Sequence, residues 1–235
     1  MKKALINITF NGSMNLIGMA LANKFNLMKN NRIFISQGIT NQFILKHLNV
    51  DTANHLKGYI DKTGLHSNKE NQGLYVIEDR QINFMSNYDF FSNTFISSDI
   101  VVKGANALYF DGDKYSASVL SSSPNLGTYG NVYMKAIASS SEVIIPISID
   151  KLINTKQFYT HTDINYFMGD FSSILLPMFY GAIFTEFEAL FETFSLKAEM
   201  VAKGGINAEN FSKVFLVHGD IQNIERVIEF LRQYN

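Results

Sequence analysis

The sequence predicts an α/β fold: an open, mostly parallel three-layer sheet followed by a small C-terminal α+β subdomain. Short apolar strands alternate with helical segments from residue 4 to residue 149. This alternation is typical of a parallel sheet that helices cover on both faces. Beyond residue 165 the pattern changes to a helix, two strands and a final helix. We therefore expect an α/β ligand-binding domain over residues 1–165 and a small α+β subdomain over residues 166–235.

Composition narrows the class of protein. Of the 235 residues, 46% are hydrophobic and 17% are charged, which argues against intrinsic disorder. The net charge is -1 and no block of like charge occurs, so no nucleic-acid or membrane partner is expected. The absence of cysteine excludes disulfides, thiolate metal sites and cysteine nucleophiles. The histidines lack metal-ligand spacing, so we expect no metal site. We also expect a cytoplasmic protein that has no cofactor.

The N-terminus imitates a secretory signal. Lysines at residues 2–3 precede an apolar stretch, and residues 20–22 read Ala-Leu-Ala, as at a cleavage site. Polar residues interrupt this stretch where a signal needs an unbroken apolar run. We therefore interpret residues 4–10 as a buried strand and residues 14–25 as a helix. Residues 174–184, the most apolar stretch elsewhere, are too short to span a bilayer.

The middle of the chain continues the alternation of strands and helices. Runs of Ile and Val bounded by turn residues predict strands, and apolar residues at helical spacing predict helices. The predicted strands are residues 32–36, 99–103 and 142–149, and the predicted helices are residues 41–48 and 127–138. Residues 73–85 predict a hairpin or an edge strand. Asp111 and Asp113 flank a glycine in a turn, although they are also candidates for a substitute base or a metal pair.

The C-terminal part has clear helix-start signals. Thr185 and Glu188 form a capping box, in which each side chain satisfies the other's backbone N–H group. Glu186 also lies in the first turn, so we interpret it as a helix-start residue and not as part of a catalytic pair. The expected elements are a strand over residues 180–184, a helix over residues 186–194, strands over residues 196–202 and 213–218, and an amphipathic helix that Asp220 caps.

Three loops combine glycine with threonine or asparagine after a predicted strand: residues 38–41, 104–106 and 125–130. In parallel sheets, ligands bind where strands end and helices begin, because free N–H groups and the helix dipole favour anions there. Glycine allows close approach of the backbone, and the polar side chains can bind an oxygen anion. Each loop taken alone is more often an ordinary helix cap than a binding site.

The order of these loops resembles a known superfamily. Residues 32–41 (RIFISQGITN) resemble the strand and phosphate loop of DeoR-type sugar-phosphate sensors and ribose-5-phosphate isomerases. Residues 99–106 resemble the strand ending in Gly-Ala-Asp that those isomerases share with the methylthioribose-1-phosphate isomerase and initiation-factor 2B group. Residues 125–130 (NLGTYG) are similar to a helix start of that second group, and residues 150–153 are similar to an isomerase Asp-x-x-Lys-Leu segment.

The resemblance to this ribose-5-phosphate isomerase, glucosamine-6-phosphate deaminase and CoA-transferase-like superfamily spans about residues 30–155. It implies that the protein binds a small phosphorylated or otherwise anionic metabolite, similar to a sugar phosphate. The implied site has Gly38, Thr40 and Asn41 at a phosphate, Gly104, Asn106, Gly127 and Thr128 closing the pocket, and Lys151 holding charge. Asn106 and Lys151 are the candidate catalytic residues.

Departures from the superfamily leave the reaction open. The family aspartate is Asn106 here, and an amide does not act as a general base near neutral pH. Ile39 replaces the first threonine of the phosphate loop, and no glutamate occurs between Ser121 and Ala138 to supply the isomerase base. The cysteine that the thioribose isomerases need is also absent.

Two alternatives to an enzyme therefore remain. The first is a non-catalytic metabolite sensor or regulatory module. The second is an oligomerisation module with a vestigial pocket, in which the aromatic residues between 179 and 194 form core or a subunit interface of a homo-oligomer.

Overall fold

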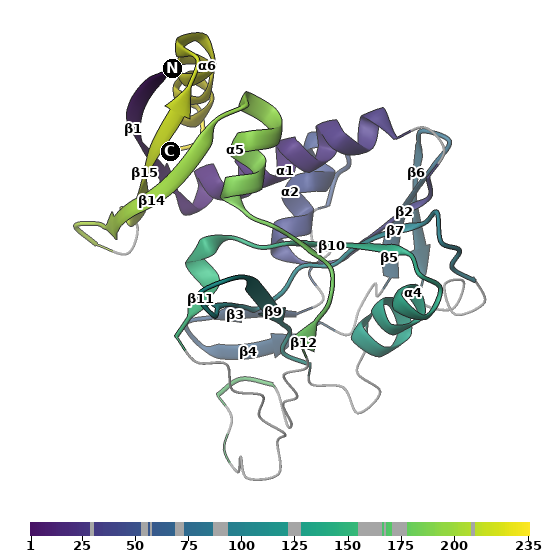
Figure 1. The fold of residues 1–235 in the computed structure, drawn as a ribbon. Helices are drawn as coiled ribbons and strands as arrows, with labels where there is room; N and C mark the ends of the chain where they lie inside the picture. Colours follow the sequence, from purple (N-terminus) through teal and green to yellow (C-terminus); the bar gives the residue numbers. More distant parts are fainter. Residues whose placement is uncertain are drawn as a thin grey trace.

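The computed structural model contains four sheets with helices around them (Figure 1). One cluster of buried apolar side chains extends through the chain from Ile6 to Leu231. The structure describes residues 1–28, 31–52, 56, 58–68, 73–86, 94–121, 128–154, 166, 168–170, 178–207 and 210–235.

The largest sheet has six strands in the order β13-β10-β7-β2-β5-β6. Four neighbouring strands are parallel: β2 (Ile33–Ser36), β7 (Ile100–Val102), β10 (Glu142–Pro146) and β13 (Ala182–Phe184). The other two, β5 (Gly73–Glu78) and β6 (Gln81–Ser86), are antiparallel. Strands β2 and β7 are buried along their whole length, which explains why their sequences are continuous apolar runs and not alternating ones.

The remaining sheets are small. Strands β1 (Lys2–Thr9), β15 (Ser212–Gly219) and β14 (Lys197–Gly204) form an antiparallel sheet, which we call the terminal sheet. A four-stranded mixed sheet has the order β11 (Leu152–Ile153), β8 (Ala107–Phe110), β9 (Tyr115–Ser118) and β12 (Met178–Phe179). Strands β3 (Gly58–Asp61) and β4 (Gly64–Ser67) form a hairpin.

The prediction of an open, mostly parallel three-layer sheet is therefore wrong, because the sheets are mixed or antiparallel and several are small. The first strand accounts for part of the error. It pairs antiparallel with β15, from Lys2 opposite Gly219 to Thr9 opposite Ser212, and does not enter the central sheet. Ile6 and Ile8 are buried whereas Leu5 is exposed. This alternation is typical of a strand whose sheet has one face in solvent.

Several predicted elements are confirmed. The strands predicted at residues 32–36, 99–103 and 142–149 correspond to β2, β7 and β10. Helix α5 (Glu186–Phe194) has the predicted capping box, and Asp220 caps α6 (Ile221–Arg232). The expected domain boundary at residues 165 and 166 stays a prediction, although the terminal sheet joins β1 to strands from beyond that boundary.

Helix α1 (Phe10–Leu27) runs from the terminal sheet toward the central sheet and packs against α2 (Ile39–His47) and α5 (Figure 1). The crossing with α2 is close at Gly18, where a Cβ atom would lie 2.7 Å from the backbone carbonyl of Phe43. A short helical segment, η1 (Tyr129–Tyr133) followed by α4 (Met134–Ala138), precedes β10. Among the helices described, none is long and apolar enough to cross a membrane.

We expect Gly18→Ala to lower the free energy of unfolding by about 1–3 kcal/mol, because the added methyl group forces α1 and α2 apart. The direction of this change distinguishes the two effects, since alanine in a helix that is free of such a contact raises the free energy of unfolding by about 1 kcal/mol relative to glycine. Urea denaturation measures the difference. Gly204→Ala is the control, because no atom lies within 4 Å of its Cβ position. A Gly18→Ala variant as stable as the parent would contradict the close crossing.

Candidate functional site

The carboxyl ends of the four parallel strands lie along one edge of the central sheet, which we call the carboxyl edge. Ile35 lies opposite Val102, Val102 opposite Ile144, and Pro146 opposite Phe184. The segments that follow these strands therefore meet there, as expected for parallel strands. Two of the predicted ligand loops, residues 38–41 and 104–106, begin at this edge, and so does the turn that holds Lys151.

Asn41 joins the ends of β2 and β7. Its Nδ2 group donates to the carbonyl of Ser36 at 2.7 Å, to the Ser36 hydroxyl at 3.2 Å and to the carbonyl of Val102 at 3.4 Å. Its Oδ1 atom is buried and has no hydrogen-bond partner among the described residues. A Cβ atom on Gly104 would lie 4.0 Å from this oxygen. The side chain therefore presents a buried, unused acceptor next to the second predicted loop.

Helix α2 begins at the carboxyl edge without a side-chain cap. Gly38 is its N-cap residue, and no side-chain cap hydrogen bond is present among the described residues. Apart from its chain neighbours, no described atom lies within 4 Å of the position that a Cβ would take on Gly38. Thr40, in the first turn, is buried. The first N–H groups of this nine-residue helix thus leave the positive end of its dipole available to an anion.

Lys151 reaches the carboxyl edge from the 3-10 turn η2 (Ile149–Lys151). Its Nζ atom donates to the carbonyl of Ala105 at 2.8 Å, between the predicted site residues Gly104 and Asn106. No carboxylate pairs with this ammonium within the described part of the chain. Loss of hydration on burial lowers the pKa of Lys151 to about 8. Lys151 is therefore a mostly buried cation without a counter-ion among the residues that the structure describes.

The other predicted site residues have different surroundings. The Oδ1 atom of Asn106 accepts from the backbone N–H of Leu120 at 3.0 Å, so this amide oxygen fixes the segment after β9. Thr128 begins the helical segment that continues as η1. Gly127 lies outside the described residues. The structure thus brings Gly38, Thr40, Asn41, Gly104, Asn106 and Lys151 to the carboxyl edge.

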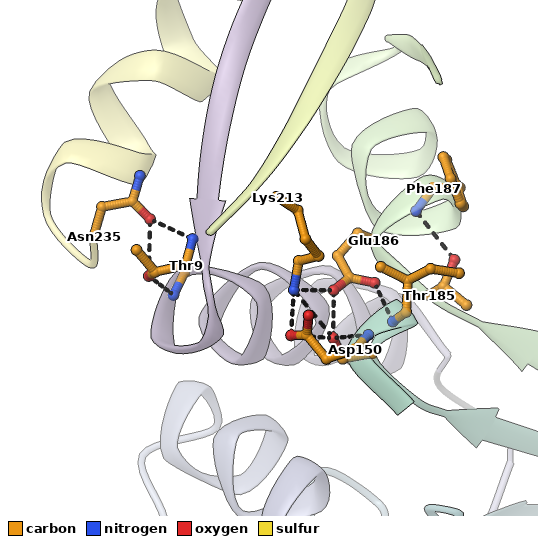
Figure 2. Close-up of polar contacts among 10 residues, drawn as sticks. Thr9, Asp150, Thr185, Glu186, Phe187, Lys213 and Asn235 are labelled. Atoms are coloured by element: carbon orange, nitrogen blue, oxygen red, sulfur yellow. Dashed lines mark hydrogen bonds and ion pairs between the residues drawn. The ribbon is translucent and has the colours of Figure 1, made fainter. Parts of the chain in front are cut away.

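A buried ionic cluster lies beside this edge, made of Ser148, Asp150, Glu186 and Lys213 (Figure 2). The Lys213 ammonium forms a close ion pair with Asp150 Oδ2 and lies 3.2 Å from Glu186 Oε1 and 3.3 Å from Ser148 Oγ. The Ser148 hydroxyl donates to Glu186 at 2.6 Å. The backbone N–H of Ile149 donates to the other Glu186 oxygen at 3.0 Å. We call this group the Lys213 cluster.

The Lys213 cluster was not predicted from the sequence. Glu188 makes the capping box as expected, but Glu186, two residues earlier in the same turn, is fully buried and faces Lys213. One signal was available. In β15, Lys213, Phe215 and Val217 alternate with less buried residues, so the lysine occupies the inward-facing phase of the strand. A charge in that phase needs a buried partner.

Neither a metal site nor a known family helps to assign the site. The described residues include no group of three or more His, Asp or Glu side chains placed to hold a metal ion. Asp111 Oδ1 accepts from the N–H groups of Asp113 and Lys114, as in an ordinary turn. Comparison with protein-family models, with curated proteins and with solved structures finds no match to this chain. The assignment therefore depends on the geometry of the chain itself.

We expect Lys213→Met to lower the free energy of unfolding by about 3–5 kcal/mol, because two carboxylates then lack their buried cation. Adding Glu186→Gln should recover part of this loss, since one uncompensated charge is removed. Lys24→Met is the control: it breaks the half-exposed pair with Glu192 and should cost less than about 1 kcal/mol. Equal effects of the two lysine substitutions, measured by urea denaturation, would show that the cluster does not contribute as a buried network.

We expect Lys151→Met to stabilise the protein near pH 7. The pKa of about 8 in the folded chain lies below 10.5 in the unfolded chain, so burial of this cation destabilises the fold wherever the lysine is charged. Removing it should raise the free energy of unfolding by roughly 1–3 kcal/mol, after loss of the bond to Ala105. The gain should shrink as the pH rises from about 8 to about 10.5. A pH-independent difference in urea denaturation would contradict this.

Proposed function

We propose that the protein binds a small phosphorylated or otherwise anionic metabolite, such as a sugar phosphate, at the carboxyl edge. The observation that carries the proposal is the Lys151 ammonium, which is largely buried and, among the described residues, bonds only to the carbonyl of Ala105. A buried charge without a partner is costly to maintain, and a bound anion removes that cost. A lysine with a structural role would instead be expected to pair with a carboxylate, as Lys213 does.

The neighbouring groups support an anion that also carries hydroxyl groups. The uncapped first turn of α2 offers backbone N–H donors for phosphate oxygens. Asn41 has already used its Nδ2 donors, so only its Oδ1 acceptor is free. That oxygen suits a hydroxyl group of the ligand and not a phosphate oxygen. A sugar phosphate supplies both kinds of group.

The same geometry bears on whether the protein is an enzyme. With a pKa of about 8, about a tenth of the Lys151 side chains are neutral at pH 7. The neutral amine can act as a base or a nucleophile. In contrast, Asn106 uses its amide oxygen to hold Leu120 and lacks a titratable group. A non-catalytic sensor is therefore the second candidate function, and Asn106 is the observation that favours it.

Thermal unfolding with ribose 5-phosphate, ribose and inorganic phosphate tests the proposal. At a hundredfold excess over the dissociation constant, a ligand of the folded state stabilises by about 2.7 kcal/mol. That corresponds to a rise in Tm of roughly 5–10 °C for a chain of this size. We expect the rise with ribose 5-phosphate, a smaller one with phosphate and none with ribose.

Matched variants identify the site. The rise should disappear in Lys151→Met and persist in Lys197→Met, which removes an exposed lysine from β14. An equal response to ribose and ribose 5-phosphate, or an unchanged response of Lys151→Met, would rule out an anion site at Lys151. NMR spectra of the bound sugar phosphate then separate the two candidates, because only an enzyme converts it over time.

A further inference from the structure

A pocket lies beside Asp150, the residue before Lys151 in η2. It is a pocket of about 790 Å³ between the start of α1, the end of α6 and the far ends of β14 and β15. This volume is in the range of about 300–1,000 Å³ that small-molecule sites occupy. The residues that line it are Thr9, Phe10, Asn11, Asp150, Lys203, Phe211, Tyr234 and Asn235. Lys151 is not among them, so this site is separate from the carboxyl edge.

Asp150 offers a fixed acceptor to the pocket. Its Oδ2 atom is bound to Lys213 and Ser148, whereas its Oδ1 atom has no partner among the described residues. The Asp150 side chain is 21% exposed, and the Lys213 side chain behind it is 1% exposed. The buried lysine therefore holds the carboxylate in place (Figure 2), and Asp150 is one of the residues that line the pocket. A positioned acceptor loses little entropy when a ligand binds.

A β-bulge brings a second charged group to the same place. Met200 lies opposite Phe215, but the next pairs are Ala202 with Val214 and Lys203 with Lys213, so Val201 is the extra residue. Without the bulge, Ala202 would lie opposite Lys213. Side chains of directly opposed residues lie on the same face of a sheet, so Lys203 shares the face of Lys213. Lys203 lines the pocket and pairs with no carboxylate in the described part of the chain.

Two charged side chains of opposite sign line the pocket, Asp150 and Lys203. Asp150 and Glu186 carry two negative charges, and Lys203 and Lys213 carry two positive ones. After the internal pairs are formed, one acceptor of Asp150 and the ammonium of Lys203 are left to bind a ligand. A ligand with a net charge would leave one of these groups repelled or unpaired. A ligand with one ammonium and one carboxylate satisfies both.

Three aromatic side chains also line the pocket. Phe10 is 51% exposed and Phe211 is 40% exposed, which is unusual for side chains that are normally buried. Both line the pocket, and Tyr234 adds a third ring. Covering these rings removes apolar surface from water, which favours a ligand with a hydrophobic body.

We propose that this pocket binds a zwitterion with an apolar body, such as an amino acid with a large apolar side chain or a short apolar peptide. The ligand ammonium binds the free oxygen of Asp150, its carboxylate binds Lys203, and its side chain covers Phe10 and Phe211. The start of α1 lies at the same pocket, and its helix dipole adds to the attraction for the carboxylate.

Three compounds with the same phenyl ring test this proposal: L-phenylalanine, phenethylamine, which lacks the carboxylate, and 3-phenylpropionate, which lacks the ammonium. Titration of the isotope-labelled protein, followed by NMR, gives the dissociation constants and the residues affected. We expect L-phenylalanine to bind about tenfold or more tightly than either of the others, because each lacks one charged hydrogen bond. The shifted signals should include Lys203 and Phe211.

Variants assign the two charges separately. Lys203→Gln should weaken L-phenylalanine to the affinity of phenethylamine and leave phenethylamine itself unchanged. Asp150→Asn should weaken L-phenylalanine to the affinity of 3-phenylpropionate. Lys197→Gln, on the same strand but opposite His218, is the control and should have no effect. Lys203 is exposed, so the Lys203→Gln result stands even if Asp150→Asn disturbs the Lys213 cluster.

Three outcomes would overturn the proposal. Equal affinity for all three compounds would indicate a purely apolar pocket. Phenethylamine or 3-phenylpropionate binding as tightly as L-phenylalanine would mean that only one charge is recognised. No binding of any of the three would exclude the site. None of these outcomes bears on Lys151, which the sugar-phosphate experiment tests with a different ligand and a different variant.

Discussion

The buried contact of Lys213 with Asp150 and Glu186 is the interaction on which the arrangement of the molecule depends. Lys213 belongs to the terminal sheet, whereas Asp150 follows β10 and Glu186 follows β13 of the central sheet. The ion pairs therefore connect two sheets that share no strand. Apolar contacts such as Phe187 with Phe215 add area at the same junction but tolerate small shifts. Buried ion pairs do not tolerate such shifts, because moving the lysine away leaves two buried carboxylates with neither a cation nor water beside them.

The turn η2 gives two adjacent residues opposite electrostatic surroundings. Asp150 points toward Lys213 and has an ion partner, whereas Lys151 points toward Ala105 and has only a carbonyl. Ser148 fixes the turn, since its hydroxyl accepts from the N–H of Asp150 and donates to Glu186. The Lys213 cluster thus holds in place the backbone that keeps Lys151 buried. The Lys213 cluster on one side of the turn thus compensates for the unfavourable buried charge of Lys151 on the other. Proteins commonly offset an unfavourable functional group by stabilising interactions elsewhere.

The sequence allowed local structure to be predicted well and long-range pairing poorly. Continuous apolar runs identified β2, β7 and β10, and capping residues identified α5 and α6. Local periodicity does not indicate which sheet a strand joins. Strand β1, for example, pairs with β15 more than two hundred residues away. The candidate site shows the same difference between local features and long-range contacts. Glycine and polar residues after strands indicated residues 38–41 and 104–106, whereas the partner of Glu186 depends on tertiary structure. The bulge at Val201, which aims Lys203, likewise has no local sequence signature.

The carboxyl edge and the pocket beside Asp150 share a backbone segment of three residues, Ile149–Lys151. The proposed anion at Lys151 and the proposed zwitterion at Asp150 would each interact with one side of this turn. If one ligand binds more tightly to one conformation of the turn than to another, its binding changes the affinity of the protein for the other ligand. The other ligand then changes the affinity for the first by the same factor. The Lys213 cluster limits the size of that coupling, because moving the turn also moves Asp150 away from its buried cation. If both proposed sites bind their ligands, the ionic network that orders the fold therefore also determines how independently they do so.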